Sequence, residues 1–132
     1  MKIFLDTNIF LDLILKRENF KESMQILNSV EKGLFEAAIL NITLLNIDYI
    51  AKKQVKDVKE FLMLVNSICT IMGADNDLFN QAFNIDNSDL EDTIQYMCAK
   101  KSKCDLIITN DKSFYHVDID VIDSKKFVER YL

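Results

Sequence analysis

Short apolar runs with no polar residue among them are the feature that most restricts how this chain can fold. The two clearest occupy residues 3–5 and 106–108, and each is followed within three residues by an aspartate, Asp6 and Asp111. Strands that are buried on both faces have continuous apolar sequences, whereas strands with one face in water alternate apolar and polar residues. The runs therefore favour a parallel sheet that is covered by helices on both sides.

Segments with the apolar spacing of helices separate these runs, so strands and helices alternate along the chain. The expected strands cover residues 2–5, 35–40, 69–72, 105–109 and 119–122, and the expected helices cover residues 8–16, 20–32, 42–54, a stretch that ends near 67, a stretch around 78–83, 88–101 and 124–131. There is no proline and there are only two glycines, so loops are short and no flexible linker divides the chain. We predict a single domain over residues 1–132 with an α/β fold, a three-layer α/β/α sandwich around a mainly parallel sheet.

Nothing in the chain predicts a membrane segment or an export signal. No apolar stretch reaches the ~18 residues that a membrane span needs, and Asp6 interrupts the first apolar run too early for a signal peptide. The three cysteines are an odd number without C-x-x-C spacing, so a disulfide framework or a zinc site is not expected, and Cys69 and Cys98 are predicted to be small buried side chains. We therefore expect a cytoplasmic protein without a membrane partner.

Several common chemistries lack the residues that they need. No glycine-rich loop is present, which excludes P-loop and dinucleotide-binding sites. The only histidine, His116, has no neighbour that suggests an activated nucleophile, and we expect it to be structural or exposed. A phosphatase of the haloacid-dehalogenase type would need a carboxylate where this chain has Asn8, and a receiver-like domain would need an acceptor aspartate in place of Leu40 or Met72. The net charge of -5 argues against unspecific nucleic-acid coating, but not against an enzyme that meets RNA through bound cations.

Three aspartates are the main candidates for a functional site. Asp6 ends the first expected strand, Asp111 follows the strand at 105–109, and Asp92 lies in the first turns of the helix at 88–101. In parallel sheets ligands bind beyond the carboxyl ends of the strands, so these acids are expected to meet there. Each pair of carboxylates at ~4 Å costs roughly 4 kcal/mol at an effective dielectric constant of about 20, which a divalent cation would offset. Oxygen ligands around an open site suit Mg²⁺ or Mn²⁺, and such an ion can direct water onto a phosphodiester.

Each of these acids also has a simpler structural interpretation. Asp6 could cap the first helix, and Asp111 could be a turn residue after Asn110. Asp92 lies opposite the apolar stripe of its helix, on a largely uncharged side with Tyr96, which favours a functional role. The three together are stronger support for a site than any one of them.

The start of the same helix contains further acids. Ser88-Asp89-Leu90-Glu91 matches a capping box, with Ser88 at the N-cap and Glu91 three residues later. We therefore interpret Asp89 and Glu91 as residues of the helix start in preference to metal ligands.

At these residues the chain resembles the PIN-domain family, which includes the VapC-like toxins of bacterial toxin–antitoxin pairs. Four stretches match in order, and together they cover nearly the whole chain: FLDTNI at 4–9, NITLLNIDYI at 41–50, DLEDTIQY at 89–96 and IITNDKSF at 107–114. The resemblance implies that Asp6, Asp92 and Asp111 hold Mg²⁺ or Mn²⁺. It also implies the roles of four further polar residues, with Asn46 at a catalytic position and Asn8, Asp89 and Thr109 in support.

Asn46 is a departure from the family pattern, because this position is usually a glutamate. Asp48 lies two residues later, about 200° further around a helix, and cannot take its place. The amide oxygen of Asn46 can still bind Mg²⁺ or a metal-bound water, but it brings no charge.

The resemblance implies a metal-dependent ribonuclease that hydrolyses RNA phosphodiester bonds. It further implies a toxin that is neutralised by a small antitoxin and that forms a homodimer. The alternative, motivated by Asn46, is a catalytically silent PIN-like module that only binds RNA or a protein. Metal-linked stabilisation would distinguish the two, because only a working site gains stability from Mg²⁺ or Mn²⁺.

Overall fold

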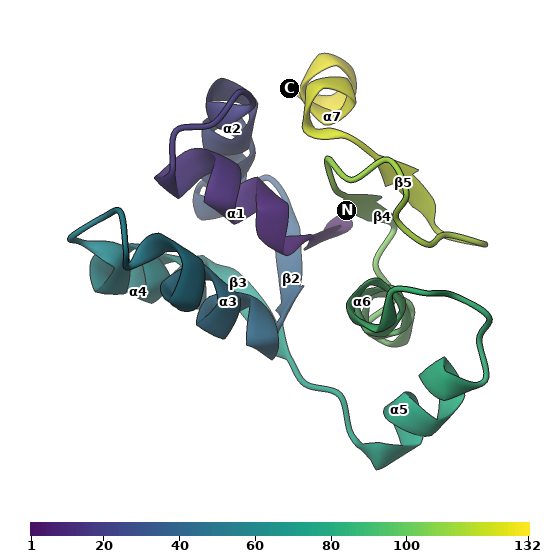
Figure 1. Ribbon diagram of the computed structural model, residues 1–132. Helices are drawn as coiled ribbons and strands as arrows, with labels where there is room; N and C mark the ends of the chain where they lie inside the picture. Colours follow the sequence, from purple (N-terminus) through teal and green to yellow (C-terminus); the bar gives the residue numbers. More distant parts are fainter.

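A five-stranded sheet in the order β3-β2-β1-β4-β5 forms the centre of the molecule (Figure 1). The computed structural model describes residues 1–132, and all four strand pairings are parallel. The elements are β1 (Lys2–Leu5), α1 (Thr7–Ile14), α2 (Phe20–Glu31), β2 (Glu36–Leu40), α3 (Asn41–Ala51), α4 (Val58–Ile68), β3 (Cys69–Met72), α5 (Asn76–Phe83), α6 (Leu90–Lys101), β4 (Leu106–Ile108), β5 (Asp120–Ile122) and α7 (Ser124–Tyr131).

Helices cover both faces of this sheet, as the sequence predicts. The chain moves outward from β1 to β2 and β3, and it then returns to β4 and β5 on the other side of β1. Because crossovers between parallel strands are right-handed, this reversal moves the connecting helices to the opposite face. Helices α1 to α4 and α7 lie on one face and α5 and α6 on the other (Figure 1).

Two hydrophobic cores result, one on each face of the sheet. Successive residues of β1 point to opposite sides, so Ile3 and Leu5 enter the larger core and Phe4 enters the smaller one. Burial of each such side chain contributes roughly 1.5–3 kcal/mol. All three cysteines are buried and unpaired, which confirms the prediction for Cys69 and Cys98. No helix of the structure is both long enough and apolar enough to span a membrane.

Helix α6 differs from its predicted form in two ways. Its N-cap is Asp89, whose carboxylate accepts the backbone N–H of Asp92 at 3.0 Å, so the predicted capping box of Ser88 and Glu91 is wrong. The side chain of Glu91 does not reach back to the cap, because it bonds to another helix instead. The predicted amphipathic pattern is also incomplete, since both sides of α6 are buried while Leu90 in its apolar stripe is 42% exposed.

The end of α2 depends on a glycine, as predicted. Gly33 has φ +79°, and its N–H donates to the carbonyl oxygen of Val30. We expect Gly33→Ala to lower the free energy of unfolding by roughly 1–2 kcal/mol, because an alanine is strained in this left-handed conformation. A urea titration would measure this, and Gly33→Asn should lose less since asparagine tolerates such angles. An alanine variant as stable as the wild type would contradict this account of the turn.

Candidate active site

The predicted acids meet at the carboxyl end of the two central strands. Asp6 directly follows β1 and Asp111 lies three residues after β4, and these strands are neighbours in the sheet. The backbone N–H of Asp6 continues their ladder by donating to the carbonyl oxygen of Ile108 at 3.1 Å. Asp92 reaches the same edge from α6. The chain reverses its direction across the sheet between β1 and β4, which is where parallel sheets form binding sites.

Asp6 is fixed by four hydrogen bonds. Its Oδ1 accepts from the backbone N–H of Thr7 at 2.7 Å and from Nε2 of Gln95 at 2.9 Å. Its Oδ2 accepts from Oγ1 of Thr109 at 2.7 Å and from Nδ2 of Asn8 at 3.1 Å. The carboxylate is only 6% exposed. Asp6 therefore caps α1 and also belongs to the acidic site, so the two interpretations of this residue hold together.

The environment of Asp6 and Asp92 disfavours their charged forms. Burial raises the pKa of Asp6, and the negative charge of Asp111 adds to the effect, although the hydrogen bonds of Asp6 act against it. The pKa of Asp92 rises to about 7, first because of burial and then because of the neighbouring acids. The two ion pairs of the structure, Lys100–Asp118 and Lys101–Asp75, do not involve these residues. The acids thus lie close enough to repel one another and have no cationic side chain as a partner.

Asp111 lies in a turn that also holds it towards the site. Its Oδ1 accepts from the backbone N–H and the Oγ of Ser113 at 3.0 and 2.8 Å. These bonds lower the pKa of Asp111. The turn interpretation of Asp111 is therefore confirmed, and its role as a metal ligand stays a prediction.

The donor set fits a hard divalent cation. The side chains at this edge offer oxygen atoms as ligands, and Oε1 of Gln95 is buried without a hydrogen-bond partner. No three acid, thiol or imidazole side chains already stand around one point as a metal-binding group. A cation at this edge would therefore have to draw the carboxylates of Asp6, Asp92 and Asp111 together. Their mutual repulsion without a cation supplies the reason why one would bind.

Asn8 and Thr109 both donate hydrogen bonds to the carboxylate of Asp6. Besides their bonds to Asp6, they lie 3.4 Å apart between Nδ2 and Oγ1. Thr109 Oγ1 also accepts the backbone N–H of Asp111 at 3.0 Å, so one hydroxyl connects both strand-end acids. Asp89 lies beside the site as the cap of α6, and its charge contributes to the raised pKa of Asp92.

Two polar residues near the site, Gln95 and Asn110, were not predicted from the sequence as parts of it. Gln95 is 1% exposed and lies three residues after Asp92, so a polar residue on a buried helix was the only available signal. Asn110 joins two helices, because its Nδ2 donates to Asp12 at 2.8 Å and its Oδ1 accepts from the N–H and the hydroxyl of Ser124 at 3.0 Å each. Asn110 thereby fixes the backbone just before Asp111.

Asn46 lies across the carboxyl edge from α6. Its Nδ2 donates to Oε1 of Glu91 at 2.7 Å. Burial raises the pKa of Glu91, and the charges of Asp6 and Asp89 raise it further, while the bond from Asn46 acts in the opposite direction. The contact of Asn46 with the acids of this edge is therefore its hydrogen bond to Glu91.

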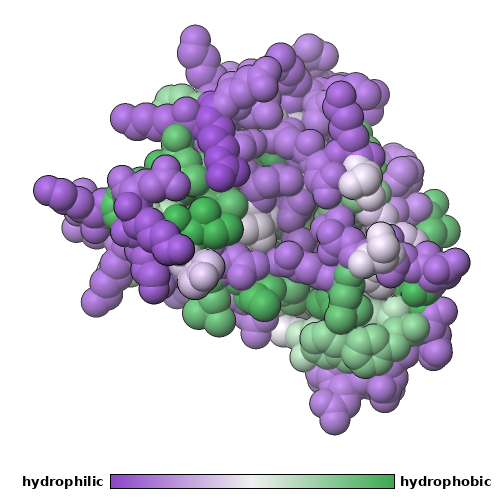
Figure 2. Space-filling view, in the orientation of Figure 1, coloured by the Kyte–Doolittle hydropathy of each residue, from purple (hydrophilic) through white to green (hydrophobic).

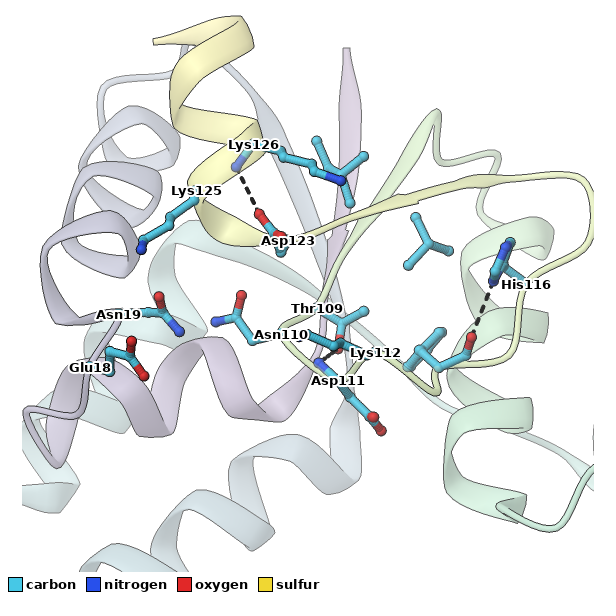
Figure 3. Close-up of a pocket in the computed structure, with 13 residues that line it drawn as sticks. Glu18, Asn19, Thr109, Asn110, Asp111, Lys112, His116, Asp123, Lys125 and Lys126 are labelled. Carbon is cyan, nitrogen blue, oxygen red and sulfur yellow. Dashed lines mark hydrogen bonds between the residues drawn. The ribbon is translucent and has the colours of Figure 1, made fainter.

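A hollow of about 590 Å³ opens beside Asp111 (Figure 3). Its walls come from the loop after β4, from β5 and the start of α7, and from the connection between α1 and α2. Lysines 112, 125 and 126 lie on its rim together with the exposed His116. Three acids, Glu18, Asp111 and Asp123, line the hollow as well, so it brings lysines next to one acid of the site.

The motif residues fall within a known family. The family model of the PIN domain matches residues 2–113, a span that contains Asp6, Asp92 and Asp111. The chain belongs to the PIN-domain family. Among PIN-domain relatives, Ribonuclease VapC1 of Aquifex aeolicus is 33% identical over 138 residues, which cover 98% of this chain and 95% of the relative. The prediction of a PIN-domain protein is confirmed.

Three solved structures share the fold of this PIN domain. A toxin–antitoxin complex from Klebsiella pneumoniae aligns with a TM-score of 0.70 at 22% identity, over 92% of this chain and 97% of that chain. VapBC2 from Rickettsia felis, bound to a DNA fragment from its promoter, aligns with a TM-score of 0.67 at 17% identity, over 93% and 98%. VapC20 from Mycobacterium tuberculosis, a toxin that cleaves the sarcin–ricin loop, aligns with a TM-score of 0.68 at 13% identity, over 85% and 92%. At these identities the likeness establishes the fold.

Proposed function

We propose that this PIN-domain chain is a metal-dependent endoribonuclease, acting as a single domain and as the toxin of a toxin–antitoxin pair. The observation that carries the proposal is a set of three carboxylates, on Asp6, Asp92 and Asp111, gathered at one sheet edge without a cationic side chain. The relative named Ribonuclease VapC1 supports the choice of RNA as the substrate. Because RNA is available there, we place the protein in the cytoplasm.

In this proposal Asp6, Asp92 and Asp111 hold Mg²⁺ or Mn²⁺. When bound, the ion supplies a polarised water and stabilises the leaving oxygen of the phosphodiester. Thr109, Asn8 and Gln95 set the orientation of the Asp6 carboxylate at this edge. The pKa of Asp92 is raised first by burial and then by the charges of its neighbouring acids, and a cation would relieve that repulsion.

The hollow beside Asp111 is the proposed path for the RNA strand. Lys112, Lys125 and Lys126 on its rim can bind phosphates on one side of the cleaved bond. Lys125 and Lys126 lie in the first turn of α7, beside its N-cap Asp123, whose Oδ1 accepts the backbone N–H of Lys126 at 2.8 Å.

Exposed apolar surface supports a protein partner. Ile42, Leu45 and Tyr49 on α3 are 42%, 70% and 63% exposed, and Phe83 on α5 is 65% exposed. Figure 2 shows hydrophobic side chains in a broken band that extends from the region of α3 and α4 to α5. A hollow of about 380 Å³ with mainly apolar walls lies between α3, α5 and α6. We propose that a small antitoxin and a second copy of the chain cover this surface, as exposed apolar patches of this kind mark protein interfaces.

Metal dependence provides the first test of this function. We expect the purified protein to cleave a mixed pool of structured RNA in Mg²⁺ or Mn²⁺ and to lose this activity in EDTA. A cation that binds only the folded site should raise the Tm, with about 2.7 kcal/mol of stabilisation at a concentration of about 100 times its Kd. NaCl at equal ionic strength controls for unspecific screening. If the wild type shows no cleavage and no metal-linked stabilisation, the enzyme is contradicted and the silent binding module remains. Stabilisation without cleavage would mean that the pool lacks the substrate.

A further inference from the structure

Asn46 provides no carboxylate at a position where the family usually has a glutamate, and the structure points to a replacement. The side chain of Asn46 comes from α3 on one face of the sheet, and Glu91 comes from α6 on the other. They meet at the carboxyl edge, with 2.7 Å between Nδ2 and Oε1. The amide of Asn46 thus holds a carboxylate on the side of the site where it provides none itself.

The local structure of α6 directs Glu91 to this place. In a capping box a glutamate three residues after the N-cap bonds back to it, but here the N-cap is Asp89, which accepts the N–H of Asp92, and Glu91 is only the second residue of α6. The carboxylate of Glu91 is therefore available for a contact outside its own helix. Its Oε1 accepts a hydrogen bond from Asn46, which is 45 residues away in the chain.

Glu91 also shares a helix side with a residue of the site. Gln95 lies four residues after Glu91, so the two side chains are neighbours on the surface of α6. Gln95 donates to Oδ1 of Asp6 at 2.9 Å, and its Oε1 remains buried without a partner. Glu91 also directly precedes Asp92 in α6, so it lies beside the acidic cluster while its side chain remains exposed to solvent.

We propose that Glu91 is the fourth acid of the cation site and that Asn46 is the residue that positions it. A neutral amide at position 46 and a carboxylate at position 91 together provide what one glutamate on α3 would provide, namely one negative charge at this side of the site. This inference rests on the proposed function. It assigns Glu91 a role that its position at a helix start does not suggest.

Mn²⁺ binding to the full-length protein tests the assignment without relying on cleavage. The concentration of free Mn²⁺ is followed by electron paramagnetic resonance during titration of the wild type, Glu91→Gln and Glu60→Gln. Glu60 is the matched control, since it is an exposed glutamate in the first turn of α4. We expect Glu91→Gln to weaken Mn²⁺ binding about 10- to 100-fold. Glu60→Gln should bind as the wild type does.

A second substitution separates a role at the site from a general loss of structure. Moving the carboxylate back to α3, with Asn46→Glu combined with Glu91→Gln, is expected to restore most of the Mn²⁺ affinity. The Tm of each variant in EDTA reports whether it folds. Wild-type affinity in folded Glu91→Gln, or no recovery in the folded double variant, would overturn the assignment.

The outcomes for Glu91 and for the proposed function remain distinguishable. If Glu91→Gln binds Mn²⁺ as the wild type does while the wild type cleaves RNA, the ribonuclease stands and Glu91 is only a helix-start residue. If the wild type binds Mn²⁺ through Glu91 but cleaves no RNA of the pool, the assignment of Glu91 stands and the substrate is in question. Absence of Mn²⁺ binding in the wild type overturns both the assignment and the metal-dependent enzyme.

Discussion

Replacing Asp92 by asparagine is expected to remove RNA cleavage while making the metal-free protein more stable. Asp92 is 7% exposed and faces the charges of Asp6, Asp89, Asp111 and Glu91. Loss of its carboxylate should lower metal-dependent cleavage about 100-fold or more. The same change removes repulsion, so the free energy of unfolding in EDTA should rise by roughly 1–2 kcal/mol and the Tm by about 3–8 °C. Cleavage assays and thermal melts on the same preparation measure both effects.

The gain in stability should depend on pH in a defined direction. The pKa of Asp92 is 3.8 in its ordinary state and about 7 in the folded protein. Folding therefore favours the protonated form, so the metal-free wild type loses stability as the pH rises from about 4 to about 7. Asp92→Asn lacks this group, and its advantage should be absent near pH 4 and full near pH 8. The exposed Asp86→Asn is the control and should show neither effect. A destabilised Asp92→Asn variant at pH 8 would mean that the carboxylate has a structural partner.

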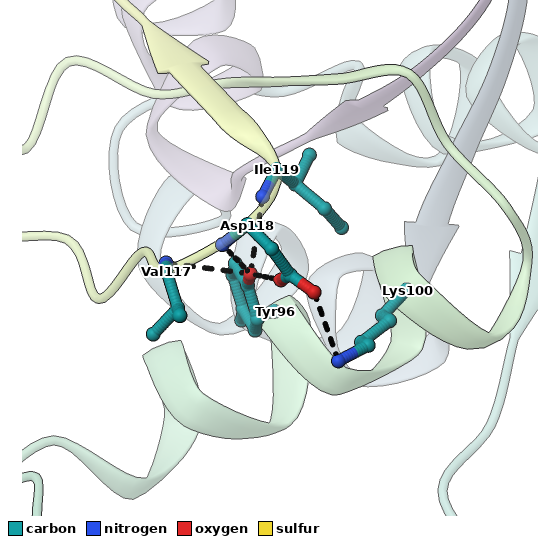
Figure 4. Close-up of polar contacts among 5 residues, drawn as sticks. All are labelled: Tyr96, Lys100, Val117, Asp118 and Ile119. Carbon is teal, nitrogen blue, oxygen red and sulfur yellow. Dashed lines mark hydrogen bonds and ion pairs between the residues drawn. The ribbon is translucent and has the colours of Figure 1, made fainter.

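Removing the hydroxyl group of Tyr96 is expected to cause the second largest change, a loss in the free energy of unfolding. This hydroxyl accepts the backbone N–H groups of Val117, Asp118 and Ile119 at 3.3, 2.7 and 3.1 Å, and it donates to the carboxylate of Asp118 (Figure 4). Lys100 pairs with the same carboxylate at 3.0 Å. Tyr96→Phe leaves these groups without their shared partner, so we expect a loss of roughly 2–3 kcal/mol in the free energy of unfolding. Urea titration would measure it.

This substitution should also reduce activity through Asp111. The hydroxyl of Tyr96 holds residues 117–119, which belong to the same connection between β4 and β5 as Asp111. A looser connection should weaken Mn²⁺ binding, but less than Asp92→Asn does. Tyr115→Phe is the matched control, because Tyr115 packs edge-on against Tyr96 with ring centroids 5.1 Å apart and its hydroxyl takes no part in this cluster. Equal stability of the two phenylalanine variants would show that the Tyr96 hydroxyl adds nothing beyond the packing of its ring.

The backbone elements could be predicted closely from the sequence. The predicted bounds of β1, β3 and α7 are those observed, and the α2 helix ends just before Gly33 as its conformation requires. The signals for these elements are local, because apolar periodicity and turn residues act within a few positions of the chain. The position of Asp6 and Asp111 could be predicted for the same reason, since a residue at the carboxyl end of a parallel strand lies at the binding edge of the sheet.

The sequence by itself therefore determined the layers of this protein, the family to which it belongs and the edge where its acids gather. Only the tertiary structure decided which polar groups serve those acids. It brings Gln95 to Asp6, joins Asn46 to Glu91, and replaces the predicted capping box with a cap by Asp89. The physical reason is that a hydrogen bond depends on distances and angles that the packing of helices across the sheet sets, and separation along the chain carries no information about them.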